Sequence, residues 1–364
     1  MFQPRFSITN NLLTYITSIE SARAMIDNAP LVPAWESKFR DDALVRTVHF
    51  GTKIEGNDLT QEQAQQIIRL EGVRDTQEAA AKAGILARDR DIQEVLNYRS
   101  VVKWIDQQQI TKPDNVFSVE TLKVLHSLTM HRLLDEENIG VYRNKQVIVR
   151  GAVSGDVVFR PPVSVEVPFL VDEFFGWYQQ ATTASVHAIF KAAITHYQLV
   201  YIHPFVEGNG RTARAMATLS LYGDGYDFKK FFSLEQYFDN NVADYYKALL
   251  SVQQNPTADL TYWLEYFCYG LALEIDKVKQ QVLKLSKDLK LKRELGQQVA
   301  LSERQIILLE ILQNQGEMSS EDAQKAVPTV SVDTLLRDLK DLIEKGVIDK
   351  RGVTKGVTYR LREP

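Results

Sequence analysis

Apolar residues recur at helical spacing along most of this chain of 364 residues. Between residues 34 and 110, stretches rich in Ala, Gln, Glu, Arg and Leu carry apolar side chains three and four positions apart, which is typical of helices that bury one face. Thr60 and Gln63 have the spacing of a capping box, which predicts a helix start. The pattern predicts a mainly α-helical fold, with further helical regions at residues 118–132, 165–202 and 211–270.

One region reads as extended chain instead. Two short runs rich in β-branched residues, 144–150 and 157–160, are separated by a segment that contains glycines. Such runs on either side of flexible residues indicate two paired strands. The prolines that follow, Pro161 and Pro162, end the second run, because proline cannot donate a hydrogen bond to a neighbouring strand. The sequence therefore predicts a short β-hairpin.

The C-terminal region has a pattern of its own. Ser302 and Gln305 form a second potential capping box, and Gly316 marks the end of that helix. Two strands are expected around a glycine-containing turn near the C-terminus. Three short helices and a hairpin within about 60 residues are typical of a winged helix-turn-helix. The helices are expected at residues 302–315, 320–326 and 331–346, and the strands at 347–352 and 356–361.

Breaks in these patterns divide the chain into four expected parts. A Lys-Pro-Asp sequence at residues 112–114 is a loop signal. Apolar residues with lysines between them, from Ile275 to Leu289, indicate a connecting helix of about two heptads, which is too short to define a coiled coil. The expected parts are an N-terminal helical region (1–112), a helical core with the hairpin (113–275), a linker helix (276–299) and the winged-helix module (300–364).

Composition and charge restrict the environment of the protein. The formal net charge of −4 argues against a protein that coats nucleic acid or anionic membranes by bulk electrostatics. Cys268 is the single cysteine, which excludes an internal disulfide and a cysteine-based zinc site, and its apolar surroundings in the sequence predict burial. No signal-peptide pattern or long apolar run occurs. We therefore expect a cytoplasmic protein without a membrane partner.

One segment carries a set of groups suited to binding phosphate. Gly208, Asn209 and Gly210 stand directly before a helix expected to begin near Arg211. Such a loop can aim backbone N–H groups at one point, where the helix dipole also favours an anion. Arg211 and Arg214 lie three positions apart and therefore project from roughly one face of that helix. The loop and the two arginines together would hold a polyphosphate.

Two other residues of the segment supply reactive groups. His203, next to the rigid Pro204, offers a base with a pKa suited to taking a proton from a hydroxyl. Glu207 offers a carboxylate beside the phosphate site, where Mg²⁺ takes one or two protein oxygens and keeps most of its waters. Each group alone has an ordinary interpretation as a structural histidine, a turn or a solvated face. Their order within twelve residues predicts transfer of a phosphate-bearing group.

The segment from His203 to Arg214 resembles the signature of the Fic family, His-Pro-Phe-x-(Asp/Glu)-Gly-Asn-Gly-Arg-x-x-Arg, at every specified position. The resemblance extends over roughly residues 10–275. It implies a Fic-type helical core and a protein adenylyltransferase, in which a histidine deprotonates a Ser, Thr or Tyr hydroxyl that attacks the α-phosphate of ATP. Pyrophosphate leaves. The substrates implied are ATP and a protein with a hydroxyl side chain, the enzyme itself included, and Mg²⁺ is the implied metal.

The resemblance also implies a role for each residue of the motif. His203 would be the catalytic base, Glu207 the Mg²⁺ ligand and Phe205 the buried anchor of the loop. Arg214 would hold the γ-phosphate. The ATP-binding residues implied by the motif are Gly208, Asn209, Gly210, Arg211 and Arg214.

Two neighbouring segments resemble other parts of the family. The sequence from Gly140 through the predicted hairpin is similar to the Fic flap, which holds the target by strand addition, although a plain edge hairpin is the alternative. The segment around residues 237–249 is similar to the helix that closes over the nucleotide base. Asn241 and Tyr245 are its candidates for contact with adenine, and core packing is the alternative for the tyrosine. The docking residues expected in the flap are Gln146, Val147, Ile148 and Val149.

An upstream segment, residues 49–57, resembles the inhibitory motif of the family, (Ser/Thr)-x-x-x-Glu-(Gly/Asn). The resemblance implies that Glu55 pairs with Arg214 and competes with ATP for that arginine. An exposed glutamate at a helix end is the alternative. Gly51 occupies the Ser/Thr position, and this departure affects the anchoring part of the motif rather than the glutamate.

The C-terminal module and the chemistry leave further alternatives. Residues 301–364 carry no excess of basic over acidic side chains, so contact with protein, including a homodimer, is favoured over contact with DNA. A transcriptional regulator with a Fic-like sensor core is the second hypothesis. A third is the same fold with another nucleotide, or removal of AMP from a modified target with Glu55 as the base that positions water.

Overall fold

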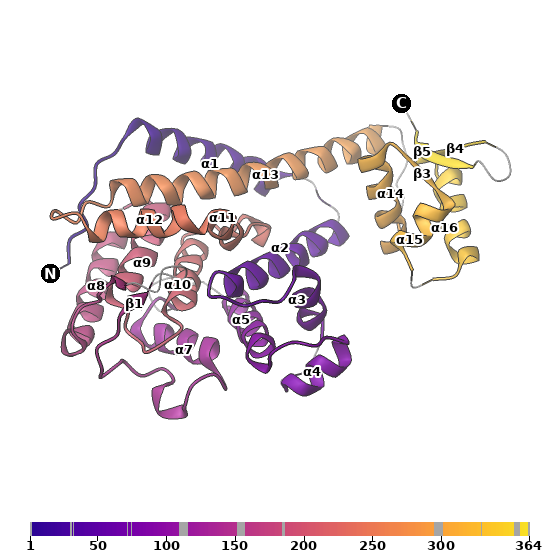
Figure 1. Cartoon of the computed structure of the whole chain (residues 1–364). Coiled ribbons are helices and arrows are strands. Elements are labelled where there is room, and N and C mark those ends of the chain that lie inside the picture. The colour runs from indigo at the N-terminus through magenta and orange to yellow at the C-terminus, as the bar shows by residue number, and fades with distance from the viewer. Residues whose placement is uncertain are drawn as a thin grey trace. The chain divides into compact units, whose positions relative to one another are not determined.

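The computed structural model describes residues 2–29, 31, 33–70, 72–73, 75–108, 116–150, 157–183, 186–294, 301–328, 330–352 and 357–362. The chain forms two compact units. The first comprises Met1–Ala29 and Trp35–Leu283, and the second comprises Pro30–Ala34 and Lys284–Pro364. Figure 1 shows the mainly helical character that the sequence predicts, which is confirmed for the described residues.

The first unit contains the helices that carry the chemical motif. Its N-terminal helices are α1 (Asn10–Asn28), α2 (Pro33–Lys53), α3 (Gln61–Ile68), α4 (Thr76–Ala83) and α5 (Asp89–Gln107). The following helices are α7 (Val119–Met130), α8 (Val167–Thr183), α9 (Ala188–Ile202), α10 (Asn209–Gly223), α11 (Leu234–Asn240), α12 (Val242–Gln253) and α13 (Thr261–Glu294). Short 3₁₀ turns lie at η1 (Glu136–Asn138), η2 (Ser164–Glu166) and η3 (Phe228–Lys230).

Polar caps fix several helix starts where the sequence predicts them. The Thr60 hydroxyl accepts from the Gln63 amide and the Gln63 side chain accepts from the Thr60 amide, so the expected capping box of α3 is confirmed. Ser118 caps α7 in the same region as expected. The continuous helix expected over residues 165–202 is wrong, because His187 caps a separate helix, α9, through its Nδ1.

Helix α9 forms the centre of the first unit. Nearly all of its residues are buried, and α10 packs extensively against it and also contacts α7 and α5 (Figure 1). Cys268 on α13 is fully buried and unpaired, as expected. Because α9 is buried and α10 packs closely against it, the loop that joins these two helices has rigid supports at both ends.

The predicted hairpin is present in short form. Strand β1 (Val149–Arg150) pairs antiparallel with β2 (Val157–Phe159). The glycine-containing segment between them, residues 151–156, lies outside the described residues. The loop expected at residues 112–114 also lies outside them.

The second unit has its own apolar core. Its elements are α14 (Glu303–Gln315), β3 (Glu317–Ser319), α15 (Ser320–Ala326), α16 (Val332–Glu344), β4 (Ile348–Arg351) and β5 (Thr358–Leu361). The strands form an antiparallel sheet in the order β3-β5-β4. Strand β3 was not predicted, because three residues are too few for an alternating pattern to be recognised. The core includes Leu308, Leu312, Leu335, Leu339, Ile348 and Tyr359.

Helix α13 runs without a break from Thr261 to Glu294, through the expected boundary between the core and the linker at residue 275. The division between the two compact units falls within this helix, at Leu283 and Lys284. Among the described residues, no helix is both long enough and apolar enough to cross a membrane.

Candidate active site

The loop between α9 and α10 brings the predicted residues together through two left-handed backbone positions. His203 ends α9 with φ 52° and donates its amide to the Leu199 carbonyl. Gly208, with φ 77°, caps the start of α10. Glycine adopts this conformation without steric cost, whereas histidine does not, so the fold holds His203 in a strained geometry. Gly210 is expected in the loop before the helix, but it lies in the first turn of α10.

Asn209 closes this loop with its side chain. Its Oδ1 accepts from the Phe205 amide at 2.9 Å, and its Nδ2 donates to the Phe205 carbonyl at 2.9 Å. Phe205 itself is fully buried, as expected for an anchor. The Asn209 side chain therefore shapes the loop, and the backbone N–H groups of the first turn of α10 remain directed at its N-terminal end.

The ring of His203 has a defined hydrogen-bonding arrangement. Nδ1 lies 3.2 Å from the Val200 carbonyl, which can only accept, so Nδ1 carries the proton and Nε2 carries the lone pair of the neutral ring. Burial lowers the pKa of His203 below its ordinary value, and the charge of Arg143 acts in the same direction. The imidazole is therefore neutral at pH 7 and can accept a proton at Nε2.

Arg143 supports the loop from the segment before the hairpin. Its Nε donates to the His203 carbonyl at 2.7 Å, and its amide donates to the Pro204 carbonyl at 2.9 Å. Its guanidinium also reaches the Pro162 carbonyl. The side chain is almost completely buried. Arg143 lies in the predicted flap region, but its place in the sequence gives no signal of this supporting contact.

His126 on α7 is a second support that sequence reasoning missed. Its ring stacks on Phe205 with centroids 3.7 Å apart. Nδ1 accepts from the Gly140 amide at 2.9 Å, so Nε2 donates to the Glu207 carbonyl at 3.0 Å. Burial lowers the pKa of His126 to about 4, which keeps the ring neutral at pH 7. A histidine on a helix gives no signal of such a role in the sequence alone.

Arg211 lies buried in the first turn of α10. It is 2% exposed, and its NH1 forms an ion pair with Glu94 at 3.3 Å. Its Nε and NH1 make no hydrogen bond to the described residues. A buried guanidinium with unused hydrogen-bonding capacity is suited to an anion. Glu207, which is partly exposed, pairs with Arg90 of α5.

Arg214 contacts the residue expected to inhibit it. Its NH2 donates to Glu55 Oε1 at 2.9 Å and to the Gly51 carbonyl at 2.9 Å. The Glu55 side chain is 28% exposed, and its partial desolvation alone would raise its pKa, but Arg214 and Arg211 more than offset this and lower it. A Cβ at Gly210 would lie 2.4 Å from Glu55 Oε1, so the glycine permits this close approach.

Packing explains why Gly51 occupies the position where the inhibitory motif has Ser or Thr. A Cβ at this position would lie 2.4 Å from Cε1 of the buried Tyr98 ring. The Tyr98 hydroxyl donates to Glu235 Oε1 at 3.1 Å, which fixes the ring against α2. Thr52, one residue later, donates its hydroxyl to the Val48 and His49 carbonyls of its own helix. A residue without a side chain is therefore required at position 51.

A cavity of about 220 Å³ opens beside these groups. Tyr245 lines it and bonds through its hydroxyl to His196 Nε2 at 2.9 Å. Among the described residues, its lining does not include Asn241, whose side chain instead caps α12. Polar lining comes from Glu55, His203, Arg214, Tyr245, Tyr246 and Gln253, and apolar lining from Val149, Val158, Phe159, Val200, Leu249 and Leu250.

The expected flap residues differ in whether they line this cavity. Val149 lines it from β1. Gln146 is exposed and donates to the Pro161 carbonyl at 2.9 Å. Val147 is partly buried, and Ile148 is exposed. Gln146, Val147 and Ile148 precede β1, so their backbone is not part of the described β1–β2 sheet.

The donor set fits a magnesium ion that is shared with phosphates. Among the residues described, no group of three or more His, Cys, Asp or Glu side chains could hold a metal ion by itself. Glu207 offers one carboxylate beside the buried Arg211. Mg²⁺ is commonly bound by one or two carboxylates and substrate phosphates.

Comparison with known proteins agrees with the motif. Residues 116–221 match the Fic/DOC family model. The chain is 26% identical over 208 residues to protein adenylyltransferase Fic of Culex quinquefasciatus, covering 57% of this chain and 38% of the relative. It is 28% identical over 187 residues to the protein of the same name in Drosophila melanogaster, covering 51% of this chain and 34% of the relative. The chain thus spans well under half the length of these curated relatives.

Solved structures show the same fold. A Fic family protein from Desulfovibrio desulfuricans superimposes with a TM-score of 0.66 at 24% identity, covering 100% of this chain and 99% of that chain. Fic-1 from C. elegans superimposes with a TM-score of 0.55 at 20% identity, covering 76% of this chain and 73% of that chain.

Proposed function

We propose that the chain is a protein adenylyltransferase that transfers AMP from ATP to Ser, Thr or Tyr hydroxyls of proteins, itself included. The observation that carries the proposal is that His203 and Arg214 line one cavity at the N-terminus of α10, beside the buried Arg211. A base and anion-binding groups around one cavity are what attack of a hydroxyl on a phosphate requires. The names of the relatives support the same reaction.

The hydrogen bonds of the site support a specific route for the proposed reaction. His203 Nε2 takes the proton of the target hydroxyl, while Nδ1 remains bonded to the Val200 carbonyl. The hydroxyl oxygen forms a bond to the α-phosphorus of ATP, and the bond from that phosphorus to the bridging oxygen of the β-phosphate breaks. Pyrophosphate leaves with the bonding electrons. The first-turn N–H groups of α10 and Arg211 stabilise the charge that develops on the phosphates.

Glu207 would hold Mg²⁺ together with the phosphates of ATP. The ion would supply charge neutralisation on the leaving pyrophosphate. Because Glu207 pairs with Arg90 in this structure, this arginine must release the carboxylate before it can bind a cation.

Glu55 would act as the brake on this reaction. Its carboxylate occupies Arg214 at 2.9 Å, so a γ-phosphate must compete for the same guanidinium. Although burial by itself lowers the pKa of Arg214, Glu55 and other neighbouring groups raise it above the ordinary value. Both partners are therefore ionised at pH 7, and the pair persists until a ligand or a substitution removes it.

Position-specific labelling of ATP tests the proposal. Label in the α-phosphate should appear covalently on protein in the Glu55→Gly variant, and label in the γ-phosphate should not. Transfer of γ-label instead would establish a kinase reaction, and the absence of transfer of either label to the enzyme and to a cell extract would refute the proposed reaction.

Removal of AMP is a second candidate, because Glu55 lines the same cavity as His203 and could position a water molecule. The two candidates make opposite predictions for Glu55→Gly. Transfer of AMP rises in this variant, whereas removal of AMP from a modified protein is lost.

A further inference from the structure

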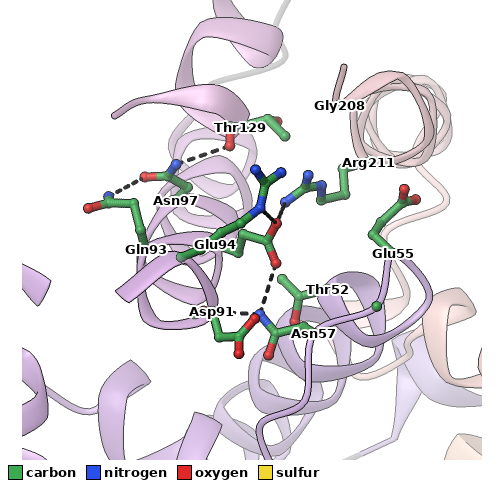
Figure 2. Close-up of polar contacts among 12 residues, drawn as sticks. Thr52, Glu55, Asn57, Asp91, Gln93, Glu94, Asn97, Thr129, Gly208 and Arg211 are labelled. Carbon is green, nitrogen blue, oxygen red and sulfur yellow. Dashed lines mark hydrogen bonds and ion pairs between the residues drawn. The ribbon is translucent and has the colours of Figure 1, made fainter. Parts of the chain in front are cut away.

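Glu94 on α5 is a buried carboxylate that lies between two parts of the proposed site. Its side chain is 6% exposed. Oε1 contacts Arg211 NH1 and Arg90 Nε, each at 3.3 Å, while Oε2 accepts from Asn57 Nδ2 at 2.9 Å. Figure 2 shows Glu94 between Arg211 on one side and Asn57 on the other. One oxygen therefore faces the phosphate-binding arginine, and the other faces the segment that follows Glu55.

Helix α5 is a rigid base for this carboxylate. Three residues after Glu94, Asn97 donates to the Thr129 carbonyl at 3.0 Å and to the His131 carbonyl at 2.7 Å, which joins α5 to the end of α7. Gln93 donates to Asn97 Oδ1 at 2.8 Å and completes this buried polar chain (Figure 2). Satisfied buried polar contacts of this kind fix side-chain positions.

Asn57 is held on both ends of its amide. Nδ2 donates to the Asp91 carbonyl at 3.0 Å as well as to Glu94, and Oδ1 accepts from the Leu59 amide at 3.1 Å. The residue stands two positions after Glu55, beyond Gly56, which has φ 92°. The short connection means that Asn57 restrains where the Glu55 carboxylate can lie.

Glu94 orients Arg211 rather than competing with a phosphate. NH1 of the guanidinium contacts the carboxylate and NH2 donates to the Met130 sulfur, so Nε, which makes no hydrogen bond to the described residues, can meet an anion without breaking that ion pair. This differs from Glu55, which occupies the group on Arg214 that the γ-phosphate would need. Without its counter-ion, a buried guanidinium would lose its orientation and its charge compensation.

From these contacts we propose that Glu94 is a positioning residue that orients Arg211 for a phosphate group and, through Asn57, holds the segment that carries Glu55. This inference rests on the proposed function, since it assigns Arg211 to ATP. The phosphate-binding and inhibitory parts of the site then share one buried anchor.

Titration calorimetry of the full-length protein with ATP tests the first part. In a Glu55→Gly background, Glu94→Gln should weaken ATP binding about ten-fold, because one charge-assisted contact of Arg211 is lost. Glu94→Asp retains the charge and should bind with intermediate affinity. Ser100→Ala is the matched control, since it removes a hydroxyl of the same helix that donates to the Leu96 carbonyl, outside the polar contacts of Glu94, and it should leave affinity unchanged.

Asn57→Ala tests the second part. With Glu55 present, loosening of its segment should strengthen ATP binding about five-fold, whereas in Glu55→Gly the same substitution should have no effect. A merely structural role of Asn57 would lower affinity equally in both backgrounds, and the thermal midpoint of each variant separates loss of fold from loss of binding.

The outcomes separate the inference from the proposed function. Equal ATP affinity of Glu55→Gly with and without Glu94→Gln, or tighter binding with it, overturns the role of Glu94 and leaves the proposed function standing. An effect of Asn57→Ala that is the same in both backgrounds overturns the coupling. Failure of Glu55→Gly itself to bind ATP overturns both the proposed function and the inference.

Discussion

Single residues decide how closely α2 and α10 approach the site. Gly51 leaves room for the Tyr98 ring and presents its carbonyl to Arg214, while Gly210 leaves room for the Glu55 carboxylate. Both glycines are in helices without positive φ, so their requirement comes from close packing. A side chain at either position would have to displace a group that the site uses.

Gly51→Ala should therefore destabilise the protein. The added methyl overlaps Tyr98 Cε1, and overpacking of this kind costs about 1–3 kcal/mol. Gly176→Ala on α8 is the matched control, because no atom lies near its added Cβ and alanine favours a helix by about 0.5–1 kcal/mol. Urea unfolding followed by circular dichroism measures both. Equal stability of Gly51→Ala and the wild type would contradict the packing account.

The ionisation of His203 gives a second prediction at this scale. Burial lowers its pKa, so the ring should titrate with a midpoint below the ordinary value of 6.5. Because the neutral ring is the proposed base, catalytic competence should be present above that midpoint and be lost as pH falls through it. Imidazole resonances assigned by comparison with His203→Asn report the midpoint by NMR. A midpoint at or above 6.5 would contradict the buried arrangement.

The motif residues could be found from sequence because they stand in a fixed order within one loop. Glu94 and His126 could not, because a lone acidic or histidine residue in a helical pattern has the signature of a solvated face. Their partners, Arg211 for one and the Gly140 amide for the other, lie far away along the chain. The burial of Arg211 likewise follows from packing of α10 against α5 and α7, where it contacts Glu94 and Met130, and local spacing does not show this.

At the scale of elements, local signals predicted helix caps better than they predicted a break within a long helical pattern. The capping boxes of α3 and α14 follow from hydrogen bonds within four residues, and both are present. The break between α8 and α9 was missed because His187 is an unusual cap. Strand β3 was missed because it is set by pairing with β5, a tertiary contact.

The connection between α7 and the loop that joins α9 to α10 gives a prediction at this scale. His126→Phe keeps an aromatic ring against Phe205 but removes the bonds to the Gly140 amide and the Glu207 carbonyl. Each lost bond is worth about 1 kcal/mol, so the Gly140 amide should exchange about five-fold faster with solvent. Hydrogen exchange measured by NMR checks this.

His131→Phe serves as the control for that experiment, because its side chain is exposed on the residue that follows the same helix. Exchange at Gly140 should be unaffected by it. Unchanged exchange in His126→Phe would show that the ring stacking alone holds the loop.

At the scale of the whole molecule, the chain consists of two compact units with separate apolar cores. The sequence predicted three helices and two strands in the C-terminal region, since each is marked by caps or glycines. The division into four parts remains a prediction. Helix α13 crosses one of the expected boundaries, because nothing in its sequence interrupts the helical pattern at residue 275.

Separate cores predict separate unfolding. Leu335 is fully buried in the core of the second unit, and Leu335→Ala should destabilise that unit by about 2–5 kcal/mol. Calorimetry should show a lower transition for the second unit and an unchanged transition for the first, with adenylyl transfer by the Glu55→Gly protein retained. A shift of both transitions would show that the units unfold together.

We propose that His203 catalyses adenylyl transfer and that Glu55 restrains it through Arg214. Intact mass spectrometry after incubation with ATP and Mg²⁺ tests it most directly, on the wild type, Glu55→Gly and Glu55→Gly/His203→Ala. We expect added adenylyl groups on Glu55→Gly, far fewer on the wild type and none on the double variant. An equal gain of mass in the double variant, or in the wild type and Glu55→Gly, would contradict the assigned base or the assigned brake.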